Sequence, residues 1–162
     1  MALLERRLAL ENLPAAVVNA SISGETTSGG RSRLQALLQI HRPSHVVIEL
    51  GGNDALRGLP LKLTRDNLSA MVQTAKATGA KVLLVGMQMP PNYGARYGQD
   101  FAALFGAVAR AEAVSLVPFL LAGVADGPQA PALFQPDRIH PTAQAQPTML
   151  ANVWAVMKPW LR

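Results

Sequence analysis

Short apolar runs of strand length alternate along this chain with longer amphipathic stretches. Four such runs lie at 15–19, 45–50, 81–85 and 115–117. Between them, stripes at helical spacing predict helices, as with Leu34, Leu37 and Leu38 ahead of Pro43. Near-continuous apolar strands separated by helices are typical of a parallel sheet that helices cover on both faces. The sequence therefore predicts an α/β fold with a doubly wound parallel sheet.

Helices and loops are expected around these strands. Helical patterns run over 3–10, 34–41, 61–78, 101–108 and 147–161. Clusters of Ser, Gly, Thr, Pro or Asn indicate loops at 21–30 and 88–94, and 126–141 is expected to be irregular. The length of 162 residues suits one domain, since domains usually hold about 100–150 residues. Residues 1–162 are therefore expected to form a single domain.

The composition excludes several classes of protein. Because the chain has no cysteine, it has no disulfide scaffold, no Cys-type zinc site and no thiol nucleophile. A hydrophobic share of 49% with 15% charged residues excludes a disordered chain. The formal charge of +5 comes from dispersed cations, with only Arg6 and Arg7 adjacent. No nucleic-acid partner is therefore expected, since nucleic-acid binding surfaces cluster their basic and aromatic residues.

The sequence has neither a membrane-spanning run nor a signal-peptide pattern. The longest mostly apolar run, 113–125, is shorter than the roughly 20 residues that a helix needs to span a bilayer. Near the start, Glu5, Arg6 and Arg7 stand where a signal peptide requires an apolar core. The sequence as it stands therefore predicts a cytoplasmic location.

Polar and glycine-rich segments follow each predicted strand. In doubly wound sheets, ligands bind beyond the carboxyl ends of the strands. The chemistry is therefore expected in the loops after Asn19, Leu50, Val85 and Val117. Glycines let a backbone approach a ligand closely, and asparagine offers an amide donor. An acid three residues before a histidine can hold one imidazole nitrogen and leave the other for a substrate.

Four motifs in these segments resemble those of the SGNH-hydrolase (GDSL-type lipase/esterase) family. Their order and spacing are most similar to its bacterial branch of multifunctional thioesterase, lysophospholipase and arylesterase enzymes. The likeness covers nearly the whole chain. The motifs are Val18 to Gly24 with Thr26, Glu49 to Asp54 with Leu56 and Arg57, Pro91 to Gly94 with Tyr97, and Asp137 to Pro141.

The resemblance implies a three-layer, flavodoxin-like fold and hydrolysis of carboxylic esters and thioesters, including lysophospholipid-type substrates, by Ser-His-Asp acyl transfer. It implies an oxyanion hole built from the Gly24 N–H and the Asn53 side-chain amide. His140 would be the general base, oriented by Asp137. No metal or organic cofactor is implied, and the partner is a small-molecule acyl ester or thioester. The substrate-binding loops would contain Leu56, Arg57, Pro91, Asn92 and Tyr93.

The nucleophile block of the family is absent from the sequence. No Gly-Asp-Ser-Leu and no Gly-x-Ser-x-Gly occurs in it, and Ser21 and Ser23 are interpreted as loop-forming residues. We therefore expect a shortened N-terminus or a start that is set too late, with the first strand of the sheet missing and strand exchange between copies. Hydrolysis is expected to be weak or absent, and the alternative is a non-catalytic acyl-binding or partner-dependent fragment. Family members are frequently exported, and an export signal would lie in that missing segment.

Other polar residues are interpreted as structural. Asp54 is expected to serve in a turn or as a helix cap, and Glu49 to be a paired carboxylate. His41 and His45 flank Pro43, which breaks any shared helix face, so no metal site is expected there.

Overall fold

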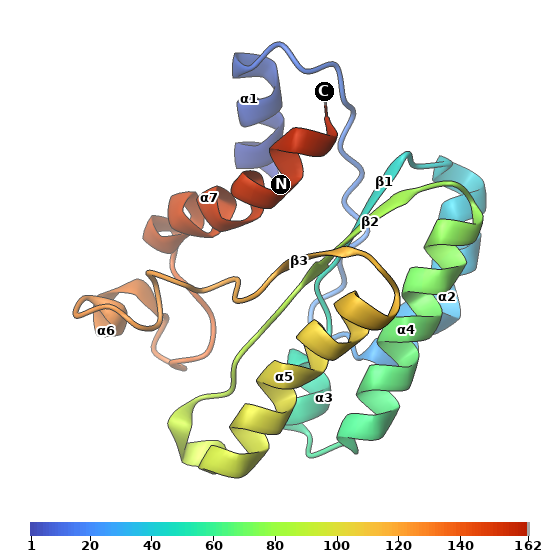
Figure 1. The fold of residues 1–162 in the computed structure, drawn as a ribbon. Helices are drawn as coiled ribbons and strands as arrows, with labels where there is room; N and C mark the ends of the chain where they lie inside the picture. The colour runs from blue at the N-terminus through green and yellow to red at the C-terminus, as the bar shows by residue number, and fades with distance from the viewer. Residues whose placement is uncertain (162) are drawn as a thin grey trace. The chain divides into compact units, whose positions relative to one another are not determined.

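The computed structural model describes residues 1–161 and divides into two compact units. One unit is Ala20–Pro118, and the residues before and after it form the other. The first unit contains the sheet, and the second contains helices from both ends of the chain (Figure 1).

The sheet of the Ala20–Pro118 unit is parallel and has three strands among the described residues. Its strands are β1 (His45–Ile48), β2 (Lys81–Val85) and β3 (Ser115–Val117), in the order β1-β2-β3. In the register of the sheet, Val46 pairs with Val82 and Leu84 with Leu116. Helices connect successive strands, as parallel pairing requires. The predicted α/β class with a parallel sheet is confirmed.

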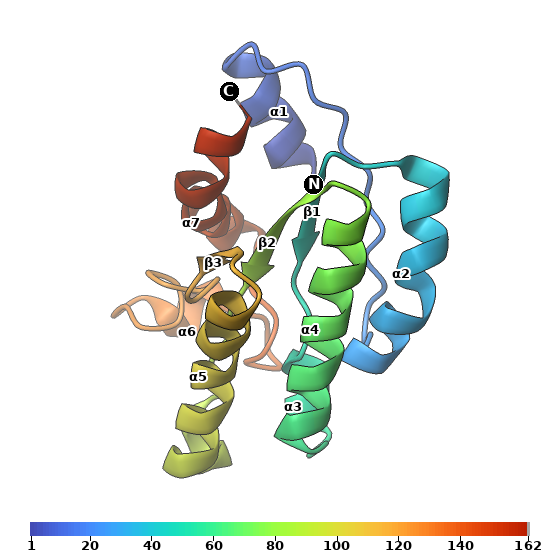
Figure 2. The same cartoon turned by 45° about the vertical axis from the view of Figure 1, so that its right-hand side comes forward.

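Helices pack side by side on one face of this sheet (Figure 2). They are α2 (Thr27–His41), α4 (Leu61–Ala77) and α5 (Ala95–Ala111), while α3 (Gly52–Leu56) and a 3-10 turn (Pro91–Tyr93) lie in the loops after β1 and β2. Phe101 and Phe105 of α5 are fully buried and meet edge to face with centroids 5.2 Å apart. Such aromatic pairs contribute beyond the area they bury. This core fixes where the loops after β1 and β2 begin.

The other unit joins the two ends of the described chain. It holds α1 (Ala2–Leu10), α6 (Ala130–Leu133), α7 (Gln146–Met157) and 3-10 turns at Ala143–Ala145 and Lys158–Trp160. The Arg7 guanidinium of α1 lies over the Trp154 ring of α7, 5.3 Å from its centroid. Lys158 adds an ion pair to Glu11 at 2.6 Å. These contacts fasten α1 to α7.

Three sequence predictions differ from the structure. Residues 15–19 form no strand, because a strand needs a hydrogen-bonded neighbour and no described segment pairs with them. The loop at 21–30 ends early, since the Thr26 side chain accepts from the Gly29 N–H at 3.3 Å and caps a helix that begins at Thr27. The irregular stretch 126–141 contains the short helix α6.

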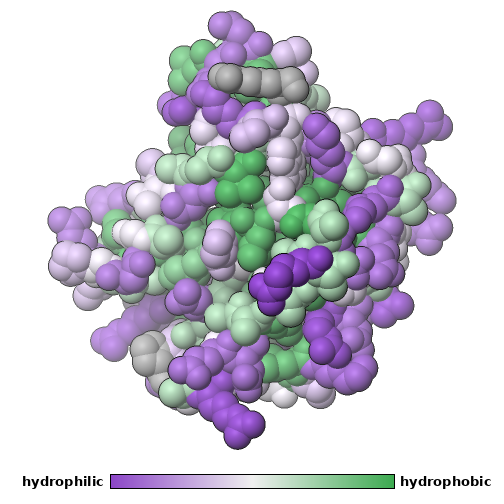
Figure 3. Space-filling model, viewed as in Figure 1, coloured by the Kyte–Doolittle hydropathy of each residue, from purple (hydrophilic) through white to green (hydrophobic). Residues whose placement is uncertain are grey.

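Apolar surface remains open on the molecule. Leu10 and Ile40 are 73% and 72% exposed, and Figure 3 shows hydrophobic residues open to solvent on one face. Within the described sheet, β1 bonds only to β2, and its Val47 is 45% exposed. The missing neighbouring strand and the exchange of strands between copies stay predictions. Across residues 1–161, no helix has the length and apolar character needed to cross a bilayer.

Candidate active site

Gly24 and Asn53 lie on two segments of the Ala20–Pro118 unit. Gly24 has φ +76°, a backbone conformation that glycine adopts without strain, and it precedes the N-terminus of α2. Asn53 stands in the first turn of α3, directly after β1. The chain turns sharply between β1 and α3 at Gly51, which has φ +119°. Gly24 therefore lies in a loop, as the sequence predicted, whereas Asn53 lies in a short helix rather than in a loop.

Side-chain hydrogen bonds fasten these two segments to each other. Arg57 donates from Nη2 to the Gly24 carbonyl at 3.0 Å, and Asn53 donates from Nδ2 to the Glu25 carbonyl at 3.1 Å. The carbonyls of the neighbouring residues Gly24 and Glu25 thus accept hydrogen bonds from Arg57, the C-cap of α3, and from Asn53 within α3. Because an amide nitrogen carries two hydrogens, Asn53 keeps a second one for another acceptor. The hydrogen bonds of Arg57 and Asn53 thus join the segment of Gly24 and Glu25 to α3.

A buried polar network lies behind the two segments. Asp54 is fully buried and accepts the Thr27 N–H at 2.8 Å as well as the Thr27 hydroxyl. Asn67 donates to the same hydroxyl at 3.1 Å, and Thr64 donates to Asp54 at 3.4 Å. The interpretation of Asp54 as a turn or helix-capping residue is right only in part: it makes no capping bond in its own helix α3, but it accepts the first N–H of α2, whose N-cap is Thr26. The polar roles of Thr64 and Asn67 could not be predicted from the sequence, because they depend on packing.

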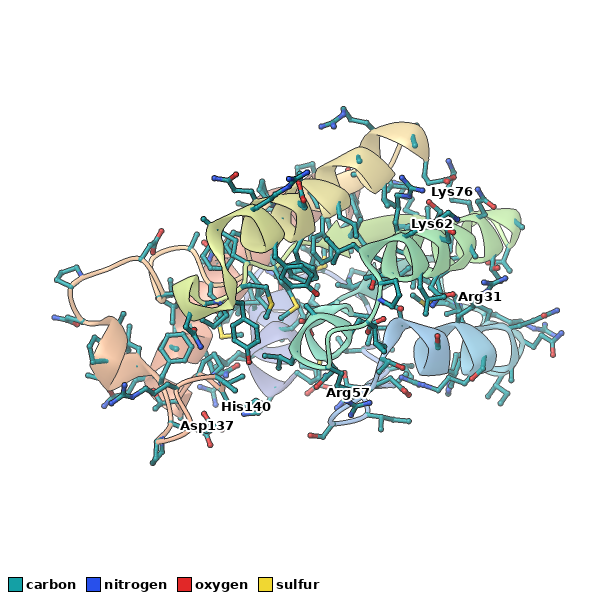
Figure 4. All side chains as sticks on the ribbon, turned by 90° about the horizontal axis from the view of Figure 1, so that it is seen from below. Arg31, Arg57, Lys62, Lys76, Asp137 and His140 are labelled. Carbon is teal, nitrogen blue, oxygen red and sulfur yellow. The ribbon has the colours of Figure 1, made fainter. Side chains whose placement is uncertain are left out.

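Asp137 and His140 form a hydrogen-bonded pair in the other unit. His140 Nδ1 lies 2.7 Å from Asp137 Oδ2, and the side chains are 66% and 44% exposed (Figure 4). Since Nδ1 is occupied, Nε2 is the nitrogen left to exchange a proton. The hydrogen bond from His140, with two from backbone N–H groups, lowers the pKa of Asp137 to about 2. A carboxylate held ionised beside an imidazole stabilises the imidazolium form.

The turn that carries this pair is closed by backbone hydrogen bonds. Asp137 Oδ1 accepts the N–H groups of Ile139 and His140 at 2.9 and 3.0 Å. The Gln135 N–H donates to the His140 carbonyl at 2.8 Å, and Phe134 bridges to Pro141. The spacing of acid and histidine is therefore fixed locally, within a few residues.

The Asp137 carboxyl should titrate near pH 2 instead of 3.8, because the His140 hydrogen bond lowers its pKa. A lowered pKa in the folded state means that the ionised carboxyl stabilises the fold above about pH 3.8, and that this stabilisation is lost as the pH falls toward 2. Carboxyl-detected NMR measures the titration. The pKa should return toward 3.8 in His140→Ala, and an ordinary pKa in the unchanged chain would show that the pair is not formed.

The predicted substrate loops lie on separate segments of the Ala20–Pro118 unit. Leu56 ends α3 and Arg57 follows it, while Asn92 and Tyr93 belong to the 3-10 turn after β2. The side chain of Pro91 falls outside the described part of the structure. Tyr97 Oη donates to the Ala55 carbonyl at 3.4 Å and so links α5 to α3. Substrate contact by these loops stays a prediction.

One structural interpretation is wrong. Glu49 was expected to be a paired carboxylate, yet within residues 1–161 no cation or hydrogen-bond donor contacts its carboxyl. Although Glu49 is exposed to solvent on one side, the protein groups around its carboxyl desolvate it and raise its pKa to about 7. Glu49 directly follows β1, and the sequence around it does not show whether a cation will lie next to its carboxyl. Among the described residues, no three His, Asp or Glu side chains are arranged to hold a metal ion.

The sequence is similar to that of known acyl hydrolases. The sequence matches the GDSL-like lipase/acylhydrolase family over residues 1–146. It is 54% identical to "Esterase TesA" of Pseudomonas aeruginosa, over 99% of this chain and 79% of that protein. It is 45% identical to "Thioesterase 1/protease 1/lysophospholipase L1" of Escherichia coli K12, over 81% of this chain and 62% of that protein. The chain thus spans less than two thirds of the second relative.

Solved structures agree with the sequence matches. The crystal structure of TesA superposes with a TM-score of 0.94 at 53% identity, covering 99% of this chain and 87% of that one. That of the esterase EstA from Pseudoalteromonas sp. gives 0.89 at 38% identity, covering 98% and 85%. These superpositions confirm the α/β fold of the SGNH-hydrolase type. The chain belongs to the GDSL-like lipase/acylhydrolase family, a family of ester and thioester hydrolases.

Proposed function

We propose that this chain hydrolyses carboxylic esters and thioesters, and that it does so slowly. The observation that carries the proposal is the Asp137–His140 pair, joined at 2.7 Å in a turn that leaves the imidazole 66% exposed. Membership of a family of acyl hydrolases supports the class of substrate. The partner is therefore a small acyl ester or thioester, including the lysophospholipid type.

Each residue has a separate task in this proposal. The Gly24 N–H and the second Asn53 amide hydrogen stabilise the negative charge that develops on the acyl oxygen. His140 Nε2 accepts the proton of the attacking group and returns it to the leaving group, while Asp137 stabilises the imidazolium. These roles require both pairs of residues to act on one acyl group. The fastening of Gly24 and Asn53 by Arg57 and Glu25 supports a preorganised pair of donors.

Hydrolysis also needs a group that attacks the acyl carbon. None of the 162 residues forms a Gly-Asp-Ser-Leu block. Ser21 and Ser23 are exposed in the loop before α2, where serine side chains commonly satisfy backbone groups. We propose that water attacks the acyl carbon, transfers a proton to His140, and releases the alcohol or thiol. Hydrolases that retain only an oxyanion hole and binding keep roughly 10³–10⁴-fold rate enhancement over water.

Hydrolysis of p-nitrophenyl acetate tests this function. The unchanged chain is expected to exceed the buffer rate, and His140→Ala should remove most of the excess because the proton acceptor is lost. Ser21→Ala and Ser23→Ala are matched controls that should leave the rate unchanged. A rate abolished by either serine change would contradict water as the nucleophile. A rate like that of an intact family member would contradict the weak enzyme.

The second candidate function is that of a non-catalytic acyl-binding or partner-dependent fragment. The same loops could bind an acyl compound without breaking a bond, alone or with a partner protein. Saturable binding of an acyl ester with no hydrolysis above buffer would favour this reading over the first.

A further inference from the structure

Arg138 stands between the paired residues Asp137 and His140 in an unusual backbone conformation. Its φ is +57°, in the left-handed region that residues other than glycine, asparagine and aspartate rarely adopt. The surrounding turn imposes this conformation, since the Arg138 N–H donates to the Gln135 carbonyl at 2.8 Å. Glycine would fit here without strain. Arg42 and Ala113 also have a positive φ, so this conformation alone does not mark a site, and the surroundings of the Arg138 side chain have to be considered as well.

The Arg138 side chain lines a pocket of its own unit. The pocket is a surface depression widely open to solvent, with a volume of about 670 Å³, and every residue that lines it comes from α6 and the turn after it. Four of the lining residues are apolar and one is a cation. The lining residues are Ala130, Pro131, Phe134, Gln135, Pro136 and Arg138. A pocket of this composition suits an amphiphilic molecule with an anionic group.

The Arg138 guanidinium is available for such an anion. Several other arginines have carboxylate partners, as Arg7 has Glu11 at 3.0 Å and Arg33 has Glu25 at 3.0 Å. Within residues 1–161, no carboxylate or hydrogen-bond acceptor contacts the Arg138 guanidinium, and the residue is exposed. The planar guanidinium fork matches the oxygens of a phosphate group and can bind two of them at once.

We propose that Arg138 and the apolar wall around Phe134 bind the phosphate-bearing leaving group of an acyl substrate. Arg138 contacts the phosphate, and Phe134 with Pro131 covers the adjoining carbon chain. The statement that the ligand is part of a substrate rests on the proposed function. The binding itself does not, because it needs no bond to break. Two kinds of leaving group carry this chemistry: the glycerol phosphate part of a lysophospholipid and the phosphorylated carrier of a thioester.

Calorimetric titration with octyl phosphate tests the binding. Arg138→Gln keeps the length of the side chain but removes its charge, and it should weaken binding of octyl phosphate about ten-fold or more. Arg138→Gly suits the positive φ, so it should stay folded and lose binding to the same degree. Arg6→Gln is the matched control: it removes one exposed cation of α1 in the same unit and should leave binding unchanged.

Further ligands show whether the phosphate group is what Arg138 binds and which leaving group it comes from. Uncharged octyl glucoside should bind the unchanged chain and Arg138→Gln within two-fold of each other, since it has no anion for Arg138. Stronger competition by glycerol 3-phosphate supports the lysophospholipid source, and stronger competition by phosphopantetheine supports the thioester source. Equal binding of octyl phosphate by the unchanged chain and both Arg138 variants would overturn the proposal, as would competition by neither phosphate. Binding without ester hydrolysis would retain this site and contradict only the proposed activity.

Discussion

Replacing Asp54 by alanine should lower the free energy of unfolding by about 3 kcal/mol. The carboxylate is fully buried and accepts the Thr27 N–H at 2.8 Å, the Thr27 hydroxyl, and the Thr64 hydroxyl at 3.4 Å. Its removal leaves these buried donors without partners, and each unsatisfied donor costs about 1–3 kcal/mol. Urea denaturation followed by circular dichroism measures the loss.

Asp66 provides the matched control for this change. It is an exposed carboxylate of α4 that pairs with Lys62 at 2.6 Å, and exposed ion pairs contribute little. Asp66→Ala should therefore leave the denaturation midpoint nearly unchanged. If the midpoints of both variants moved by the same small amount, the buried network would not stabilise the N-terminus of α2.

Replacing Asn53 by alanine should lower the rate of p-nitrophenyl acetate hydrolysis about 100- to 1000-fold. Removal of one oxyanion donor has an effect of this size in other hydrolases. The hydrogen bond of Asn53 to the Glu25 carbonyl shows how its amide is positioned. The rate constant at saturating ester should fall more than the Michaelis constant rises, because the donor acts on the transition state.

Two further variants separate charge stabilisation from simple damage to the fold. Asn53→Asp preserves the shape of the side chain but cannot donate when ionised, so it should be as slow as Asn53→Ala. Gln99→Ala removes an exposed amide of α5 and should be without effect. Full activity in Asn53→Asp would show that Asn53 is not an oxyanion donor.

Much of the sheet could be predicted from the sequence because each strand carries its own apolar signal. The run 81–85 matches β2, and 115–117 matches β3. The run 15–19 has a similar signal but forms no strand, since strand formation also depends on a neighbour that the run itself does not specify. A local apolar pattern therefore predicts that a segment can form a strand. Whether the strand forms depends on a neighbouring strand with which it can pair.

The same contrast holds for polar residues. The hydrogen bond of Asp137 to His140 spans three positions, so spacing alone could suggest it. Asp54 meets Thr27 across 27 positions and Asn67 meets Thr27 across 40, and only the packed fold brings them together. The left-handed backbone of Arg138 also escaped prediction, because arginine gives no sign of a positive φ. The catalytic roles of Gly24, Asn53, Asp137 and His140 stay predictions.

The rates of ester hydrolysis in Asn53→Ala, His140→Ala and the double variant test most directly whether the two pairs act on one acyl group. Groups that act as a unit on one transition state have strongly non-additive effects. We expect each single variant to lose most of the activity, and the double variant to be about as slow as the slower single one. A double variant whose loss of rate equals the product of the two single losses would contradict the account, because the two pairs would then act independently.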